Sequence, residues 1–166
     1  FIANPNNPTG TLLSPDDLHA FLRAVPQDVA VILDEAYGEF LEAADRAPSV
    51  EWLAEFPNLI VTRTFSKAYG LAGLRVGYAL ARPEVADLIN RVRQPFNVNS
   101  LALTAATAAL GDTDFLTESK RVNDAGMAQL IEGFKALGLE WIPSWGNFVC
   151  VRVGDAARVF QALLRA

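Results

Sequence analysis

Apolar runs and amphipathic segments alternate along the first half of the chain. A continuous apolar run at residues 29–33 is typical of a strand in a sheet that helices cover on both faces, and further strands are expected at 59–64 and 76–80. Ser14, followed by a proline and two acids, predicts a helix that extends to about residue 25. This order of elements predicts an α/β fold with a mostly parallel sheet.

The second half of the chain is richer in helical patterns. A helix is expected over residues 83–93, and the Gln-Pro-Phe sequence that follows it marks a boundary between two structural units. We place these units at residues 1–98 and 99–166, the second being a smaller, incomplete α+β unit. Its expected elements are helices over 101–110 and 115–137, strands over 140–142 and 147–153, and a helix from 156. The long helix is expected to bury Met127, Leu130, Ile131 and Phe134.

Polar segments follow three of the predicted strands. They are Asn4–Gly10 near the start of the chain, Asp34–Tyr37, and the turn that contains Lys67. In open α/β sheets, ligands bind outside the carboxyl ends of parallel strands, where loops and helix N-termini converge. The three segments are therefore expected to border one crevice.

Lys67 is the most informative residue of the chain. It lies among hydroxyls and glycines, and a Schiff-base lysine for an aldehyde cofactor needs such a fixed position. The hydroxyls of Thr64 and Ser66, nearby backbone N–H groups and the guanidinium of Arg75 can together bind a phosphate dianion. Because most lysines are solvated surface charges, this interpretation depends on the other two polar segments.

Asp34, Tyr37 and Asn7 extend the prediction to a cofactor with a pyridine ring. An acid beside the ring nitrogen keeps it protonated, and Tyr37 and Asn7 could bond the phenolic oxygen of the ring. The simpler alternative is that Asp34 caps the next segment and that Tyr37 packs as a half-buried aromatic side chain. The bond between Asn7 and Pro8 is a candidate cis peptide.

Composition argues against several other kinds of site. A net charge of -5 without a basic run argues against nucleic-acid binding. One cysteine cannot form an internal disulfide, no Cys/His cluster has metal-ligand spacing, and no apolar run could span a membrane, so we expect a cytoplasmic, metal-free protein. The glycines of residues 70–77 fit no dinucleotide or P-loop pattern and are expected to permit close backbone approach.

Two residues are given structural rather than chemical roles. His19, the only histidine, is expected to point away from an apolar helix face formed by Leu18, Phe21, Leu22 and Val25. No motif supplies His19 with a partner acid or nucleophile, so we assign it no catalytic role. Cys150, within Phe-Val-Cys-Val, is expected to be a small buried hydrophobic residue.

Six motifs occur in order along the chain. They are Asn-Pro-Asn-Asn-Pro-Thr-Gly at 4–10, Asp-Glu-Ala-Tyr at 34–37, Thr-Phe-Ser-Lys at 64–67, Gly-Leu-Ala-Gly-Leu-Arg-Val-Gly at 70–77, Gln-Pro-Phe-Asn-Val-Asn at 94–99 and, more weakly, Gly-Asn-Phe at 146–148. Together they resemble the pyridoxal-phosphate-dependent aminotransferases of fold type I, and most closely the histidinol-phosphate aminotransferases. The resemblance implies a three-layer αβα large domain with a smaller C-terminal domain, and pyridoxal 5'-phosphate as cofactor.

The resemblance also implies a role for each site residue. Lys67 would hold the cofactor and then move the proton between the substrate α-carbon and the cofactor. The other implied contacts are Asp34 with the pyridinium nitrogen, Tyr37 and Asn7 with the phenolic oxygen, and Thr64, Ser66 and Arg75 with the phosphate.

Members of this family are roughly twice as long, so the resemblance implies that the chain is a fragment. An N-terminal half with further cofactor contacts would be absent, and the arginine that binds the substrate carboxylate would lie beyond residue 166. Arg152 is not assigned that role. We therefore expect the chain alone to be inactive, and the full-length protein to be a homodimer that uses an amino donor and 2-oxoglutarate.

Three alternatives to a histidinol-phosphate aminotransferase remain open at this point. An aromatic aminotransferase or a decarboxylase of a phosphorylated amino acid would share the cofactor residues and differ in the groups that orient the substrate. The third alternative is a non-catalytic, aminotransferase-like ligand-binding domain of a transcription regulator. A DNA-binding unit upstream would distinguish this regulator from the enzymes.

Overall fold

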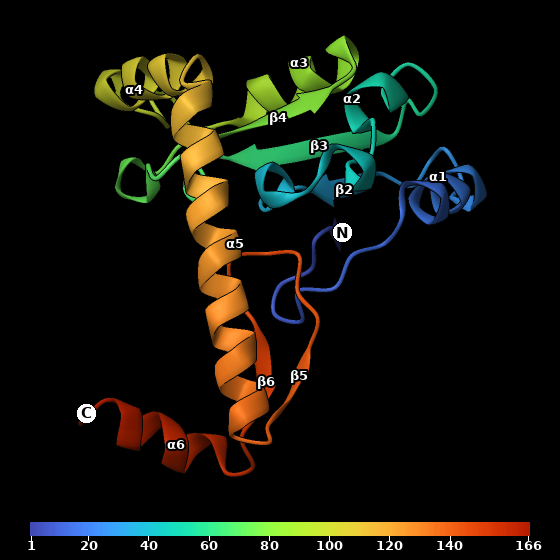
Figure 1. The fold of residues 1–166 in the computed structure, drawn as a ribbon. Helices are drawn as coiled ribbons and strands as arrows, with labels where there is room; N and C mark the ends of the chain where they lie inside the picture. The colour runs from blue at the N-terminus through green and yellow to red at the C-terminus, as the bar shows by residue number, and fades with distance from the viewer.

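The structure is a computed structural model that describes residues 1–166 and contains two sheets (Figure 1). The four-stranded sheet comprises β1 (Ile2–Ala3), β2 (Val31–Asp34), β3 (Leu59–Thr64) and β4 (Gly77–Ala81), in that spatial order. The two-stranded sheet comprises β5 (Glu140–Ile142) and β6 (Cys150–Arg152). The helices are α1 (Pro15–Ala24), α2 (Ser49–Trp52), α3 (Pro83–Val92), α4 (Ser100–Leu110), α5 (Thr113–Ala136) and α6 (Ala156–Leu163).

Three of the four strands in the larger sheet are parallel, as predicted. Strand β2 lies between β1 and β3, with Asp34 opposite Thr62, and β4 runs antiparallel to β3, with Thr64 opposite Gly77. The strand predicted at 76–80 therefore exists but reverses direction. The connection from β3 to β4 contains only a short 3₁₀ turn, whereas a parallel crossover needs a longer segment that is usually an α-helix.

Helix α1 begins where its sequence predicts and packs on one face of the sheet. The Ser14 hydroxyl accepts a hydrogen bond of 3.1 Å from the backbone N–H of Asp17, which caps the helix. Leu18 and Leu22 are buried against β2 and β3, together with Trp52 and Phe56 from α2 and the segment after it. Phe21, predicted on the same face, is 45% exposed because it lies at the edge of that stripe.

The two faces of the sheet are covered unequally. Leu33, Leu59 and Val61 are fully buried beneath α1 and α2, and burying each such side chain contributes about 1.5–3 kcal/mol. Ile32 and Ile60 point to the other face and are half-buried. Helices were expected to cover both faces of the sheet, but in the structure they cover only one face completely.

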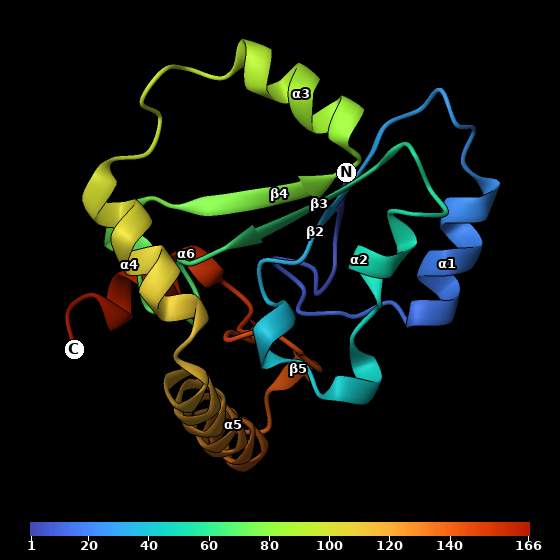
Figure 2. The same cartoon turned by 90° about the horizontal axis from the view of Figure 1, so that it is seen from above.

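Helices α4 and α5 connect the larger sheet to the smaller one. Ala102 and Ala106 of α4 pack against Phe65 and Val76, beside the larger sheet. Helix α5 then extends away from this sheet to β5 and β6 (Figure 1). In the view from above, α1 and α2 lie on the side opposite α4 and α5 (Figure 2). The division at residues 98 and 99 stays a prediction.

The apolar face predicted for α5 is less buried than expected. Phe134 contacts Trp141 of β5, with ring centres 6.4 Å apart, but no residue of α5 is buried and Leu130 is 48% exposed. Two short strands cover too little of a 24-residue helix to bury its apolar face. Neither α5 nor any other helix combines the length and apolar character needed to cross a membrane.

Candidate active site

An open cavity of about 480 Å³ lies at the carboxyl ends of β1, β2 and β3. Because these strands are parallel, their polar ends meet at one edge of the sheet. All seven residues predicted from the sequence line the cavity: Asn7, Asp34, Tyr37, Thr64, Ser66, Lys67 and Arg75. The crevice expected from the three polar segments is therefore present.

The segment after β1 forms a tight turn. Its bonds Asn4–Pro5 and Asn7–Pro8 are both cis; the second was predicted and the first was not. Asn4 is buried, and its side chain exchanges hydrogen bonds with the backbone N–H and carbonyl of Leu13 at 2.8 and 3.1 Å. These bonds anchor the turn whose Asn7 side chain reaches the cavity.

Asp34 and Tyr37 line the cavity after β2. The Asp34 carboxylate is exposed and accepts a hydrogen bond of 3.1 Å from the N–H of Ala36. Tyr37 is buried, and its ring lies edge-on to Phe148 with ring centres 5.1 Å apart. The simpler interpretations, a cap and a packed aromatic, thus describe real contacts, but both side chains also face the cavity.

The turn after β3 holds Lys67 at the cavity. The buried side chains of Phe65 and Ala68 anchor the turn on both sides, while Lys67 is exposed. Within the turn, the Thr64 hydroxyl accepts a hydrogen bond of 3.1 Å from the N–H of Ser66. The Lys67 amine lies 5.4 Å from the centre of the Tyr37 ring, so the amine and the phenol from two strand ends are neighbours.

Arg75 completes the cavity from the connection between β3 and β4, two residues before β4 begins. Its backbone is left-handed at φ 54°, an uncommon and strained conformation for a residue other than glycine. Its guanidinium donates a hydrogen bond of 2.8 Å to the carbonyl of Ala72. Nearby, a Cβ on Gly77 would lie 2.8 Å from the Arg63 carbonyl, which confirms the predicted close approach at that glycine, whereas nothing crowds Gly73.

Sequence reasoning assigned no role to three residues around the site, although two of them lie within the six motifs. Glu35 and Arg63 form an ion pair of 2.8 Å between the ends of β2 and β3, and Phe148 packs on Tyr37. Burial disfavours the charged form of Arg63, but the Glu35 carboxylate, with a smaller contribution from Tyr78, outweighs this and raises the pKa of Arg63 above its usual range. The adjacency of Glu35 to Asp34 and of Arg63 to Thr64 was the available signal.

His19 and Cys150 lie outside the cavity. The expectation that His19 points away from the apolar face is wrong, because its ring contacts the core residues Trp52 and Phe56. His19 also hydrogen-bonds Glu55 at 3.0 Å, so an acid that no motif indicated is within its reach. Cys150 is exposed, contrary to prediction. Successive side chains of β6 point to opposite faces, and only that of Val151 is half-buried. Strand β6 is also shorter than the predicted strand over 147–153.

Known proteins resemble this chain over its whole length. A model of the aminotransferase class I and II family matches residues 1–166. Histidinol-phosphate aminotransferase 2 of Pseudomonas fluorescens strain Pf-5 is 63% identical over 166 residues, which cover 99% of this chain and 45% of that protein. The chain therefore spans about half the length of the curated relatives it matches.

Solved structures share the fold. Histidinol-phosphate aminotransferase from Sinorhizobium meliloti, in complex with pyridoxal-5'-phosphate, has a TM-score of 0.89 and 37% identity over 98% of this chain and 44% of that one. L-threonine-O-3-phosphate decarboxylase from Porphyromonas gingivalis has a TM-score of 0.85 and 29% identity over 99% of this chain and 50% of that one. These findings confirm fold type I, and the chain belongs to the class I and II aminotransferase family.

Proposed function

We propose that this chain is part of a pyridoxal-phosphate-dependent aminotransferase that acts on histidinol phosphate and 2-oxoglutarate in histidine biosynthesis. The observation that carries the proposal is the meeting of Lys67, Asp34 and Arg75 around one cavity at the carboxyl ends of β1, β2 and β3. A homodimer in the cytoplasm belongs to the same proposal and rests on resemblance to the family.

The groups around the cavity fit this cofactor chemically. The volume of the cavity, about 480 Å³, lies within the range of small-molecule sites, roughly 300–1,000 Å³. Lys67 offers an amine for the aldehyde, and Asp34 offers a carboxylate for a protonated ring nitrogen. The hydroxyls of Thr64 and Ser66 and the guanidinium of Arg75 suit a phosphate.

Each side chain then has a defined task. Pyridoxal phosphate, when bound, supplies an aldehyde that captures amines and a ring that withdraws electrons from the substrate α-carbon. Asp34 would hold a proton on the ring nitrogen, while Tyr37 and Asn7 would orient the ring through its phenolic oxygen. The Lys67 amine would take the proton from the substrate α-carbon and return it as general acid.

The identity of the relatives supports histidinol phosphate as the amino donor. The match to a histidinol-phosphate aminotransferase is 63% identical, against 29% for the phosphothreonine decarboxylase of the same fold. The groups that orient the substrate are expected outside this chain, so the cofactor residues alone do not separate these activities.

A trapping experiment tests the cofactor role. Pyridoxal phosphate is added to the protein at its full gene-encoded length, reduced with borohydride, and the labelled lysine is located by mass spectrometry. We expect the label on Lys67 and none at that position in Lys67→Ala.

Initial rates with histidinol phosphate, aromatic amino acids and phosphothreonine then test the substrate. A preference for aromatic amino acids or for phosphothreonine would overturn the assignment.

A further inference from the structure

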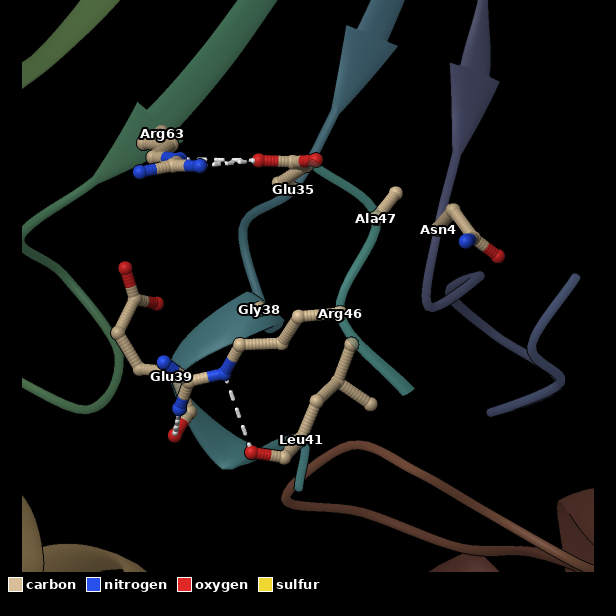
Figure 3. Close-up of a pocket in the computed structure, with 8 residues that line it drawn as sticks. All are labelled: Asn4, Glu35, Gly38, Glu39, Leu41, Arg46, Ala47 and Arg63. Atoms are coloured by element: carbon tan, nitrogen blue, oxygen red, sulfur yellow. Dashed lines mark hydrogen bonds and ion pairs between the residues drawn. The ribbon is translucent and has the colours of Figure 1, made fainter. Parts of the chain in front are cut away.

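An ion pair between a buried carboxylate and a half-buried guanidinium joins the ends of β2 and β3 beside the cavity. One carboxylate oxygen of Glu35 accepts a hydrogen bond of 2.9 Å from Nε of Arg63 and lies 2.8 Å from Nη2 of the same guanidinium. Glu35 is only 8% exposed, and the Arg63 side chain is 29% exposed. Figure 3 shows the two side chains meeting between neighbouring strands.

The pair lies next to the two segments that carry the proposed cofactor contacts. Glu35 follows Asp34 directly, and Arg63 precedes Thr64 directly. The backbone N–H of Glu35 also donates to the Thr62 carbonyl at 2.9 Å, so one residue is tied to β3 through both its backbone and its side chain. Any shift of Glu35 relative to Arg63 would therefore shift Asp34 relative to Thr64.

Arg63 lines both the cofactor cavity and a smaller cavity of about 90 Å³. Glu35 lines only the smaller one, where Glu39 is a second carboxylate. Arg46, also in that cavity, donates to the carbonyls of Leu41 and Glu39 at 3.2 and 3.1 Å (Figure 3). Arg63 is hydrogen-bonded to Glu35 and to no other carboxylate.

Stability alone is a weak explanation for such a pair. The cost of removing two charges from water often matches or exceeds the attraction between them, so a buried ion pair contributes little net stability. Its directional bonds do, however, fix the separation of the groups that carry it. The pair at the ends of β2 and β3 is placed where that separation matters for the site.

We propose that Glu35 and Arg63 are positioning residues, which hold the Asp34 carboxylate at a set distance from the Thr64–Lys67 turn and thereby determine cofactor affinity. The inference rests on the proposed function. Glu35 acts only through other residues, because it does not line the cofactor cavity.

Glu35→Gln is the discriminating variant, because it keeps the shape of the side chain and removes the negative charge that pairs with Arg63. Pyridoxal phosphate affinity is measured by absorbance titration of the protein at its full gene-encoded length. We expect pyridoxal phosphate to bind about tenfold more weakly to Glu35→Gln and to Arg63→Gln. In the double variant, the loss of affinity should be smaller than the product of the two single losses. Glu39→Gln, which alters the other carboxylate of the small cavity, is the matched control and should bind within about twofold of the parent.

Two further readouts separate positioning from a purely structural role. Urea unfolding without cofactor reports folding, and the pH midpoint of the visible band of bound cofactor reports the alignment of Asp34. A structural role would lower the unfolding midpoint but leave affinity and pH midpoint unchanged in the folded protein. If Glu35→Gln fails to fold, Arg63→Lys, which keeps the charge and loses the two-nitrogen contact, should still weaken binding and shift the pH midpoint.

The outcomes for the two proposals are distinct. Parent protein that does not bind pyridoxal phosphate would overturn the proposed function and the positioning role together. Parent protein that binds, with a Glu35→Gln variant as tight as Glu39→Gln, would overturn the positioning role alone.

Discussion

The side-chain amide of Asn7 donates a hydrogen bond of 2.7 Å to the hydroxyl oxygen of Tyr37. This bond joins the turn after β1 to the segment after β2, two parts of the chain that are 30 residues apart. The Tyr37 ring is held by burial and by its contact with Phe148. The two polar groups are therefore already positioned before a ligand binds, which lowers the entropic cost of binding.

Replacing Tyr37 with Phe should weaken cofactor binding without disrupting the fold. The change removes one hydroxyl and keeps the ring that packs against Phe148. A hydrogen bond contributes about 0.5–1.5 kcal/mol net, so we expect roughly twofold to tenfold weaker binding of pyridoxal phosphate. Absorbance titration measures the change directly.

Tyr69→Phe is the control for this prediction. Tyr69 packs against Phe65 and does not line the cofactor cavity, so removing its hydroxyl should leave affinity unchanged. Equal losses in both variants would show that the effect of Tyr37 is not specific to its place in the site.

The residues of the site could be predicted because each one follows an apolar run or lies in a short motif. Asp34 is the last residue of β2, and Lys67 lies in the turn after β3. A parallel sheet brings such strand ends together whatever the details of packing. Local sequence therefore carried most of the information about which side chains line the cavity.

The supporting contacts could not be predicted in this way. The Glu35–Arg63 and His19–Glu55 pairs join residues 28 and 36 positions apart, and their formation depends on strand register and helix docking. The exposure of Cys150 depends on how much of the small sheet is covered, which an apolar run does not reveal. Partners and degree of burial are thus set by tertiary packing.

Gly10 is expected to be intolerant of substitution. Its φ is +77°, and a Cβ there would lie 2.2 Å from the Ser144 hydroxyl and 2.9 Å from the Ser144 backbone. The left-handed conformation alone costs a residue with a side chain about 1–2 kcal/mol, so with the clash Gly10→Ala should lose more than about 2 kcal/mol. The substitution should also weaken the hydrogen bond of 2.9 Å from the Trp145 N–H to the Gly10 carbonyl. Urea unfolding measures the loss of stability.

Gly133→Ala is the matched substitution with the opposite expectation. Gly133 lies within α5, and a Cβ added there would meet no neighbouring atom within 4 Å. Alanine favours helices over glycine by about 0.5–1 kcal/mol, so this variant should be slightly more stable. A similar loss in both glycine variants would contradict the assignment of the Gly10 effect to its φ and to Ser144.

Glu39 should make stability depend on pH. Burial raises the pKa of Glu39 above 4.5, although a backbone hydrogen bond, Arg63 and Arg46 oppose this, and one of its oxygens has no hydrogen-bond partner. The folded state therefore keeps this proton to higher pH than the unfolded state does. The contribution is fully present below pH 4.5 and is lost as pH rises through the folded-state pKa.

Glu39→Gln should remove this dependence. The variant carries no charge at any pH, so we expect it to be more stable than the parent near neutral pH, with the difference shrinking as pH falls toward 4.5. Urea unfolding at several pH values measures the difference, with Glu51→Gln on the exposed part of α2 as control. A stability difference that stays constant with pH would contradict a titrating Glu39.

The 166-residue chain by itself should show no steady transamination. Lys67, Asp34 and Arg75 are all exposed, so solvent reaches the groups that would hold the cofactor and move the proton. A well-solvated site stabilises developing charge poorly and admits competing hydrolysis. The chain also spans only 45% of the relative it matches at 63% identity, so more of the site is expected beyond it.

This last prediction is checked with histidinol phosphate, 2-oxoglutarate and added pyridoxal phosphate, by comparing the chain with its Lys67→Ala variant. We expect equal rates, since residual exchange catalysed by free cofactor does not need the lysine. Adding the protein at its full gene-encoded length to the same assay should give a lysine-dependent rate. Turnover by the chain alone above that of Lys67→Ala would mean that the three strand ends supply enough of the site for catalysis.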